Sequence, residues 1–141
     1  MALVIPTQIH SAIRRHLEGT FPGEGGGFMI GTQDGQNRSV SEVRFVENIF
    51  ESEEQYHRYL MEAGAFQEAE DYAEENGLML VGYFHSHPDH PAIPSEFDRA
   101  NAMPNFMYLI VSVREGQAAE SHAWELAESY ERFNPVLLEE A

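Results

Sequence analysis

The chain has 141 residues, of which 43% are hydrophobic, and these values are typical of one folded domain and not of a disordered chain. Its 24 acidic residues outnumber 8 basic residues, and the resulting formal net charge of -16 disfavours a nucleic-acid partner. The lack of cysteine excludes disulfides, thiolate metal sites and cysteine nucleophiles. We therefore expect a single domain that spans residues 1–141.

The start of the chain shows no targeting signal. A short apolar run precedes Pro6, and no basic leader comes before it, so we expect no signal peptide. The longest apolar runs, such as residues 78–84, are far too short to span a bilayer. These features predict a cytoplasmic protein without a membrane partner.

The first predicted element is a helix over residues 6–19, with Thr7 as its N-cap and Gly19 as its stop. One face of this helix carries side chains at helical spacing, namely Ile9, Ala12, Ile13, His16 and Leu17. This face is expected to pack on a sheet, although such a helix could also form the interface of a homodimer.

The middle of the chain predicts a hairpin and a second helix. The expected elements are a glycine-rich loop over residues 21–27, strands over 28–32, 39–46 and 56–61, and a helix over 62–77. Asp34-Gly35 is a strong turn signal between the first two strands, and Asn76-Gly77 ends the helix.

The second half predicts strands that are buried on both faces. The expected elements are strands over residues 78–87, 106–113 and 121–126, a short helix over 95–102 and an edge strand over 134–141. The large apolar side chains expected in the core are Phe28, Met29, Leu80, Tyr108, Ile110 and Trp124. Helices that alternate with such strands indicate an α/β or α+β fold with a mixed sheet.

His85 and His87 lie two residues apart at the end of the predicted central strand. Side chains at this spacing point to the same face of a strand, so the two imidazoles can converge on one metal ion. Pro88 follows and is expected to stop the strand. The alternative interpretation is a pair of ordinary half-buried histidines.

Asp98 is the best candidate for a third metal ligand. Together with Ser95 it forms S-x-x-D, which also predicts a helix N-cap with a capping-box partner. Both interpretations can hold if the first helical turn faces the histidines. Glu24, in the glycine-rich loop, is the candidate base beside the metal, although it could also be one more solvated acid.

These segments resemble a known family. Residues 85–98, HSHPDHPAIPSEFD, look like the H-x-H-P…S-x-x-D signature of the JAMM/MPN-type zinc metalloproteases. Residues 21–31, FPGEGGGFMIG, resemble the Glu-x-x-Gly segment of that family. The order of elements also matches, from Ile5 to about Leu126. The implied fold is a JAMM/MPN-like mixed, strongly curved sheet flanked by helices.

The resemblance implies a role for each matched residue. His85, His87 and Asp98 correspond to the ligands of a zinc ion, Zn2+. Glu24 corresponds to the general acid/base that activates the zinc-bound water, and Ser95 to the serine that steadies the oxyanion. The implied activity is that of a zinc metallopeptidase or isopeptidase.

Three features lie outside this match or depart from it. Gly25 and Gly26 stand where family members often carry cysteine, which should loosen the loop. His90 is not a family ligand and is expected to be exposed or at the rim of the substrate site. Asn48 and the segment Tyr56–Tyr59 resemble parts of shorter bacterial members that shape the cleft.

The short connections leave little room for the insertions with which deubiquitinating members grip ubiquitin. The chain resembles instead compact prokaryotic members that act on ubiquitin-like sulfur-carrier proteins, cleaving the amide bond after a C-terminal Gly-Gly. A strand edge near the zinc, within residues 40–46 or 56–61, could bind this tail by strand addition.

Two alternatives come from other classes. Two histidines and one carboxylate also form the facial triad of non-haem iron enzymes, although the order of ligands here differs from the usual one. The second alternative is a non-catalytic MPN-type protein-interaction module, against which all five matched residues argue. A zinc nucleotide deaminase is excluded because it needs paired cysteines.

Overall fold

The computed structural model describes residues 1–46, 63–103, 105–129 and 131–141. The described strands are β1 (Ala2–Ile5), β2 (Gly26–Asp34), β3 (Asn37–Val46), β4 (Met79–Pro88), β5 (Met107–Arg114), β6 (Gln117–Leu126) and β7 (Phe133–Glu140). The described helices are α1 (Thr7–Thr20), α2 (Ala63–Glu75) and α3 (Glu96–Asn101). None of these helices is long and apolar enough to cross a membrane.

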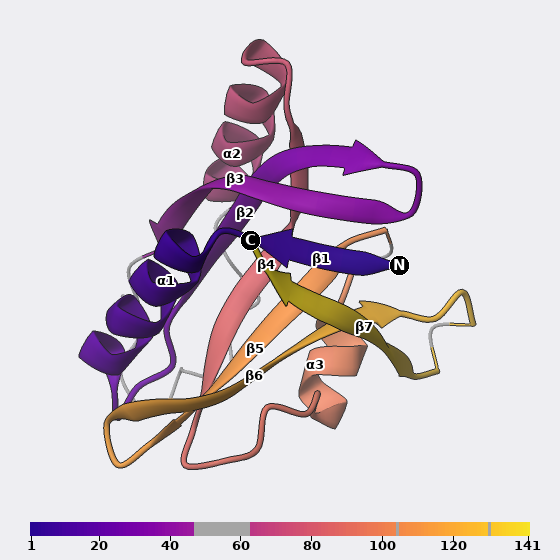
Figure 1. Ribbon diagram of the computed structural model, residues 1–141. Coiled ribbons are helices and arrows are strands. Elements are labelled where there is room, and N and C mark those ends of the chain that lie inside the picture. The colour runs from indigo at the N-terminus through magenta and orange to yellow at the C-terminus, as the bar shows by residue number, and fades with distance from the viewer. Residues whose placement is uncertain (47–62, 104, 130) are drawn as a thin grey trace.

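The strands close into a barrel in the order β1-β3-β2-β4-β5-β6-β7 (Figure 1). β1 runs parallel to both β3 and β7, and β4 runs parallel to β5. The remaining pairs are antiparallel. The predicted mixed, strongly curved sheet is therefore confirmed, and its curvature extends to closure.

The closure depends on two short segments at the ends of the chain. β1 was not predicted, and residues 134–141 were wrongly predicted as an edge, because β7 lies between β6 and β1. The backbone N–H of Thr7 donates to the carbonyl of Ala141, and the N–H of Ala141 donates to the carbonyl of Ile5. The ends of β1 and β7 therefore meet beside the start of α1, whereas the N-terminus lies at the other end of β1 (Figure 1).

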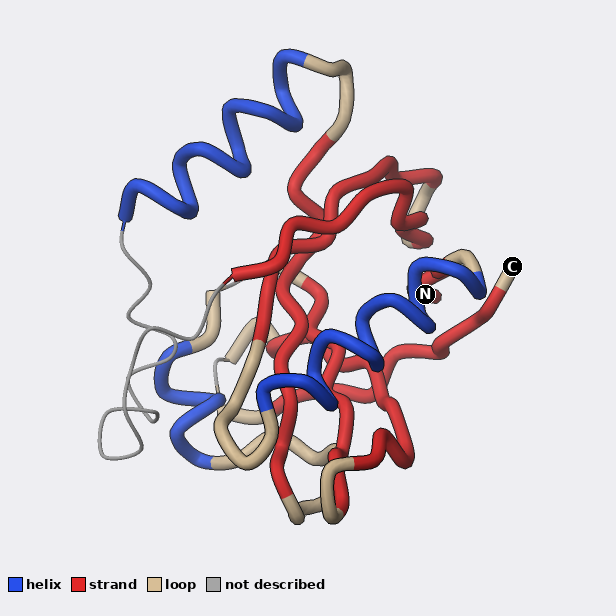
Figure 2. Tube along the Cα trace, turned by 90° about the vertical axis from the view of Figure 1, so that its left-hand side faces the viewer, coloured by secondary structure: helices blue, strands red, loops and turns tan. Residues whose placement is uncertain are grey.

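Helix α1 lies across the strands of the barrel (Figure 2) and buries His10, Ile13 and Leu17. The prediction of Thr7 as the N-cap is wrong, because Pro6 holds that position and makes no side-chain cap. The helix also continues past Gly19 to Thr20. A glycine at the exposed end of a helix is tolerated there and does not force a stop.

Central strands β2 and β4 alternate between two apolar clusters, as expected for strands that are buried on both faces. The cluster on the inner side of the barrel includes Met29, Val81 and Phe84, to which α1 adds Ile13 and Leu17. The second cluster lies under α2 and includes Phe28, Ile30, Leu80, Tyr83, Tyr108, Ala69 and Ala73. Five of the six predicted core residues are buried, whereas Trp124 is only half-buried.

Two predictions from the middle of the chain lie outside the described residues. They are the strand over residues 56–61 and the cleft-shaping role of Asn48 and Tyr56–Tyr59. The neighbouring helix α2 is described from Ala63, and it packs with Ala69 and Ala73 buried and Ala65, Phe66 and Tyr72 half-buried beside them.

Candidate metal centre and catalytic site

The strand end of β4 presents His85 and His87 on one face. Both side chains are buried, with only 1% and 6% of their surface exposed. Their Nε2 atoms lie 3.3 Å apart. β4 continues one residue further than expected, because Pro88 still pairs with Val113 of β5 before the chain leaves the sheet. The central position of β4, between β2 and β5, holds both imidazoles in place.

Asp98 reaches the same point from α3 and is 2% exposed. Its Oδ2 lies 3.0 Å from Nε2 of His87, and its Oδ1 lies 3.3 Å from Nε2 of His85. The same side chain completes a capping box: Oδ2 accepts from the N–H of Ser95, and Oγ of Ser95 accepts from the N–H of Asp98. The capping-box interpretation of S-x-x-D is therefore confirmed, and it is compatible with the metal-ligand interpretation, since the cap aims the carboxylate at the histidines.

The hydrogen bonds of His87 test whether this cluster suits a cation. Its Nδ1 lies 2.8 Å from the carbonyl oxygen of Pro91, which can only accept, so Nδ1 carries the proton. In the neutral imidazole, Nε2 then presents a lone pair to a carboxylate that is also an acceptor. Only a proton or a metal ion between these atoms makes the contact favourable.

The donor set fits a zinc ion. One nitrogen or oxygen of each of His85, His87 and Asp98 lies within 4.8 Å of the other two. Two imidazoles and one carboxylate are a common ligand set for catalytic zinc, which leaves a fourth position for water or substrate. The carbonyl of Pro91 fixes the tautomer of His87, as outer hydrogen bonds of metal-binding histidines usually do.

The charges of the cluster depend on each other. Burial acts to lower the pKa of His87, but the hydrogen bonds to Asp98 and Pro91 and the charges of Asp98 and Glu24 raise it above its ordinary value. Burial likewise acts to raise the pKa of Asp98, but its hydrogen bonds to His85 and His87 hold it well below its usual range. Asp98 is therefore ionised, and Glu24 is close enough for its charge to act on His87.

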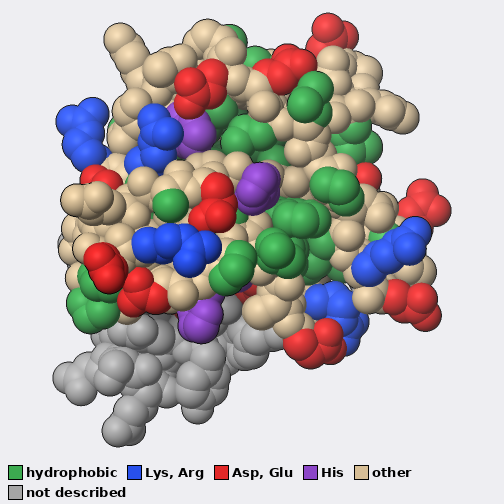
Figure 3. Space-filling view, turned by 60° about the horizontal axis from the view of Figure 1, so that its bottom comes forward, with side chains coloured by type: hydrophobic (Ala, Val, Ile, Leu, Met, Phe, Trp, Pro, Cys, Tyr) green, Lys and Arg blue, Asp and Glu red, His purple; other side chains and the backbone are tan. Residues whose placement is uncertain are grey.

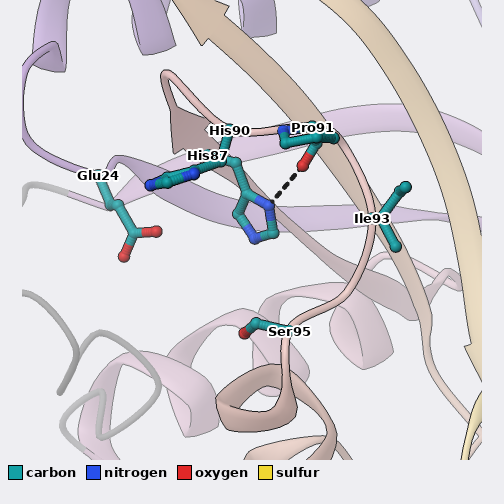
Figure 4. A pocket seen from close by; sticks show the side chains of 6 residues that line it. All are labelled: Glu24, His87, His90, Pro91, Ile93 and Ser95. Carbon is teal, nitrogen blue, oxygen red and sulfur yellow. Dashed lines mark hydrogen bonds between the residues drawn. The ribbon is translucent and has the colours of Figure 1, made fainter.

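Glu24 lies in the loop before β2 and is half-buried. It lines a cavity of about 360 Å³ together with His87, His90, Pro91, Ile93 and Ser95. Figure 4 shows Glu24 and Ile93 on opposite sides of His87, with Ser95 below it. The structure thus brings together all five predicted site residues, since His85 and Asp98 both contact Nε2 of His87.

The loop that carries Glu24 is fixed to β4. Gly26 pairs with His85, and the adjacent Gly25 makes two hydrogen bonds with Ser86. A Cβ atom on Gly26 would lie 2.8 Å from the carbonyl oxygen of Phe84, so only glycine allows this close approach. The expectation that Gly25 and Gly26 loosen the loop is therefore wrong, because both are buried in this contact.

His90 is exposed at the rim of the cavity, as predicted. Its carbonyl accepts a hydrogen bond of 2.6 Å from Oγ of the buried Ser112. Two further carbonyls of the same loop are held, that of Pro91 by His87 and that of Ala92 by the indole N–H of Trp124. The proline-rich loop is therefore anchored at three successive residues.

The sequence matches a family model over most of its length. The model describes prokaryotic homologs of the JAB domain and matches residues 6–127. The chain belongs to the JAB/MPN domain family. This membership agrees with the closed mixed sheet and with the position of the histidine pair at the end of β4.

Relatives within this family share both sequence and fold. A probable TtuB-protein conjugate cleaving protease of Thermus thermophilus is 32% identical over 110 residues, which are 78% of this chain and 70% of that protein. The solution structure of a Salinibacter ruber protein is 37% identical, with a TM-score of 0.76 over 100% of this chain and 92% of that chain.

Two other solved structures have folds similar to that of this chain. The solution structure of a Desulfitobacterium hafniense protein has a TM-score of 0.79 at 25% identity, over 99% of this chain and 94% of that chain. A crystal structure of a JAB1/MPN domain protein from Archaeoglobus fulgidus has a TM-score of 0.62 at 14% identity, over 97% of each chain. At this low identity the last comparison shows the fold alone.

Sequence reasoning missed the residues that orient the site. They are Ser86, the carbonyl of Pro91, Ser112 and Trp124. The backbone carbonyl leaves no signal in the sequence. Ser86 did leave a signal, because it lies between the two histidines. Alternation along the strand turns its side chain to the opposite, apolar face of β4, where a buried hydroxyl needs a hydrogen-bond partner.

Proposed function

We propose that this chain is a zinc-dependent peptidase that hydrolyses the amide bond after the C-terminal Gly-Gly of a ubiquitin-like sulfur-carrier protein. The observation that carries the proposal is that Glu24 lines the same cavity as His87, whose side chain forms one buried cluster with His85 and Asp98. Membership of the JAB/MPN family and the T. thermophilus relative support it.

His85, His87 and Asp98 are the residues that would hold the zinc ion. Zinc bound there would supply a positive charge that polarises the scissile carbonyl and lowers the pKa of water. Asp98 contributes one negative charge to the ligand set and the imidazoles none, so the bound ion would keep a net positive charge. The capping box and the carbonyl of Pro91 keep the three ligands oriented.

Glu24 acts as the general base and acid. Its carboxylate accepts a proton from water as the oxygen adds to the carbonyl carbon, and it later gives that proton to the leaving amine. The C–N bond breaks, leaving a carboxylate on the Gly-Gly tail and a free amine. Oγ of Ser95 accepts from the N–H of Asp98, so its own O–H can donate to the carbonyl oxygen as negative charge develops.

The substrate class follows from the relative and from the shape of the site. The T. thermophilus relative is named for cleaving conjugates of TtuB, and we extend this kind of substrate to the present chain. A Gly-Gly tail has no side chains, which suits a site whose proposed ligands are buried. Conjugates of a carrier protein and linear extensions of its tail both present such a bond.

The tail is proposed to bind along β3. On the edge of β3 that faces β1, the register joins β1 to Arg38 and Ser39 only. Among the described strands, none pairs with residues 40–46 on this edge. Val46 lies opposite Gly26, and Gly26 lies opposite His85. A tail added to this edge would therefore reach the cavity on the side of Glu24.

Two alternatives remain distinguishable by experiment. A non-catalytic MPN-type module would not need Glu24, and a two-histidine, one-carboxylate iron enzyme would contain iron. Metal analysis of the purified protein, combined with an assay for 2-oxoglutarate turnover, separates the iron enzyme from the peptidase.

The direct test uses a carrier protein whose tail is extended beyond Gly-Gly, with mass spectrometry of the product. Zinc-loaded wild type should release the extension, and Glu24→Gln should lower the rate by at least about 100-fold. Glu24→Gln should keep the far-UV circular dichroism and the zinc content of the wild type. Equal rates for the two proteins, or no zinc-dependent cleavage of any Gly-Gly substrate, would contradict the proposal.

A further inference from the structure

A second groove adjoins the cavity of the candidate site. It has a volume of about 230 Å³ and is lined by Ile93, Pro94, Ser95, Glu96, Arg99, Trp124, Arg132 and Phe133. Ile93 and Ser95 line both hollows, so the groove lies directly beside the cavity. We call it the leaving-group groove for the reason that follows.

The floor of the groove is apolar. Phe133 packs edge-on against the buried Tyr108, with ring centroids 5.7 Å apart, and the indole of Trp124 is held by its hydrogen bond to Ala92. Ile93 stands at the entrance with 58% of its surface exposed. Figure 3 brings forward the bottom of Figure 1, where the proline-rich loop after β4 lies, and hydrophobic side chains gather on this face. Such a floor accommodates an aliphatic or aromatic side chain of a substrate.

The rim of the groove is basic in an otherwise acidic chain. Arg99 and Arg132 are two of only 8 basic residues in a chain of net charge -16. Glu96 pairs with Arg99, and the charge of Glu131 also acts on Arg99, so the positive charge that remains at the rim is that of Arg132. Among the described residues no ion pair involves Arg132. The rim therefore complements an acidic side chain and repels a basic one.

The position of the groove indicates which part of the substrate it meets. A carrier tail on β3 would enter the cavity from the side of Glu24 and Val46. Ile93 lies on the other side of His87 from Glu24 (Figure 4). The chain beyond the scissile bond then leaves toward Ile93 and Ser95, where the groove begins.

We propose that the leaving-group groove is a specificity site for the amine side of the conjugate. It selects target segments that carry an acidic side chain next to an aliphatic or aromatic one, close to the conjugated amine. This inference rests on the proposed function and adds the chemistry of the leaving group to it.

The test compares three substrates with the same Gly-Gly acyl side and different leaving peptides, which contain Glu-Phe, Lys-Phe or Ala-Ala. Wild type should cleave the Glu-Phe substrate about fivefold faster, in kcat/KM, than the Lys-Phe substrate. The preference should shrink as salt is added. Arg132→Glu should reverse it, whereas Arg15→Glu, which changes an exposed arginine of α1 outside the groove, should leave it unchanged.

The outcomes separate the two proposals. Equal cleavage of all three substrates, or a preference that survives Arg132→Glu, overturns the groove and leaves the peptidase proposal standing. If no substrate is cleaved, the peptidase proposal fails, and the groove is decided by fluorescence anisotropy of the free labelled peptides on Glu24→Gln protein. Tighter binding of the Glu-Phe peptide, lost in Arg132→Glu, supports the groove, and equal binding of all peptides overturns it.

Discussion

Ser86 and Gly25 hold each other through two reciprocal hydrogen bonds. The N–H of Gly25 donates to Oγ of Ser86, and the N–H of Ser86 donates to the carbonyl of Gly25, both at 3.0 Å. Ser86 lies between the two histidines and is fully buried, and Gly25 follows Glu24 directly. One serine therefore ties the candidate base to the strand that carries the candidate metal ligands.

Replacement of Ser86 by alanine should damage this link and spare the metal. The N–H of Gly25 would be buried without an acceptor, at a cost of about 1–3 kcal/mol in the free energy of unfolding. Because Glu24 would lose its fixed position, kcat should fall about tenfold while KM and zinc content stay near the wild-type values.

Urea unfolding, zinc analysis and steady-state kinetics check this prediction. Ser86→Thr keeps the hydroxyl and should recover most of the lost kcat, and Ser39→Ala, at an exposed position of β3 outside residues 40–46, is the matched control. An unchanged kcat in Ser86→Ala would show that the hydrogen bonds do not position Glu24.

The glycines at positions 26 and 19 should respond in opposite ways to alanine. A Cβ atom on Gly26 would lie 2.3 Å from the hydroxyl of Tyr83 and 2.8 Å from the carbonyl of Phe84, so Gly26→Ala should destabilise the fold by about 1–3 kcal/mol. Gly19 lies in α1 with no atom within 4 Å of such a Cβ, so Gly19→Ala should stabilise the fold by up to about 1 kcal/mol.

Midpoints of urea unfolding compare these two variants with the wild type. A neutral effect of Gly26→Ala would mean that the close approach of the glycine-rich loop to β4 is not as described. Destabilisation by Gly19→Ala would contradict the open space described around Gly19 in α1.

The buried His10 should make the fold less stable in mild acid. Its Nε2 lies 2.9 Å from Oγ of Ser121, and its Nδ1 contacts the carboxylate of Glu140. Burial lowers the pKa of His10, and the hydrogen bond to Glu140 opposes this only in part. The hydrogen bond with His10 in turn lowers the pKa of Glu140. Both groups therefore bind protons more readily in the unfolded chain.

The sign of the effect follows from these directions. The contribution of His10 is fully present above its unfolded pKa of about 6.5 and is lost as the pH falls, and that of Glu140 is lost at lower pH still. Urea unfolding of wild type and His10→Gln at pH 8 and pH 5 measures this contribution. The stability advantage of the wild type should shrink at pH 5, whereas a constant difference would exclude titration of His10 as the cause.

Local patterns predicted most elements but not the closure of the sheet. Alternation and helical spacing depend on neighbouring residues, so strands such as β4 and the face of α1 that includes Ile13 and Leu17 could be inferred. β1 is too short to show a period, and its pairing with Leu137 and Leu138 joins opposite ends of the chain. A non-local pairing of this kind leaves no local signal, and for this reason β7 was predicted as an edge.

Local patterns likewise predicted some residues of the candidate site and not others. The spacing of His85 and His87 and the capping motif of Ser95 and Asp98 are local, and both could be predicted from physical chemistry. Glu24 is far from these residues in the sequence. Because it is one of 24 acidic residues, nothing local distinguishes it, so its assignment depended on family resemblance. The partner of Ser86 could not be predicted, because it depends on the register between β2 and β4.

The zinc content of the purified chain tests the metal centre most directly. Isothermal titration of metal-stripped protein with zinc should give one site per chain in both wild type and Glu24→Gln, since Glu24 is proposed to handle protons and not to bind the ion. His87→Ala should lose this site while the fold, followed by circular dichroism, persists. Failure of the wild type to bind zinc, or binding that His87→Ala leaves unchanged, would contradict a metal centre at His85, His87 and Asp98.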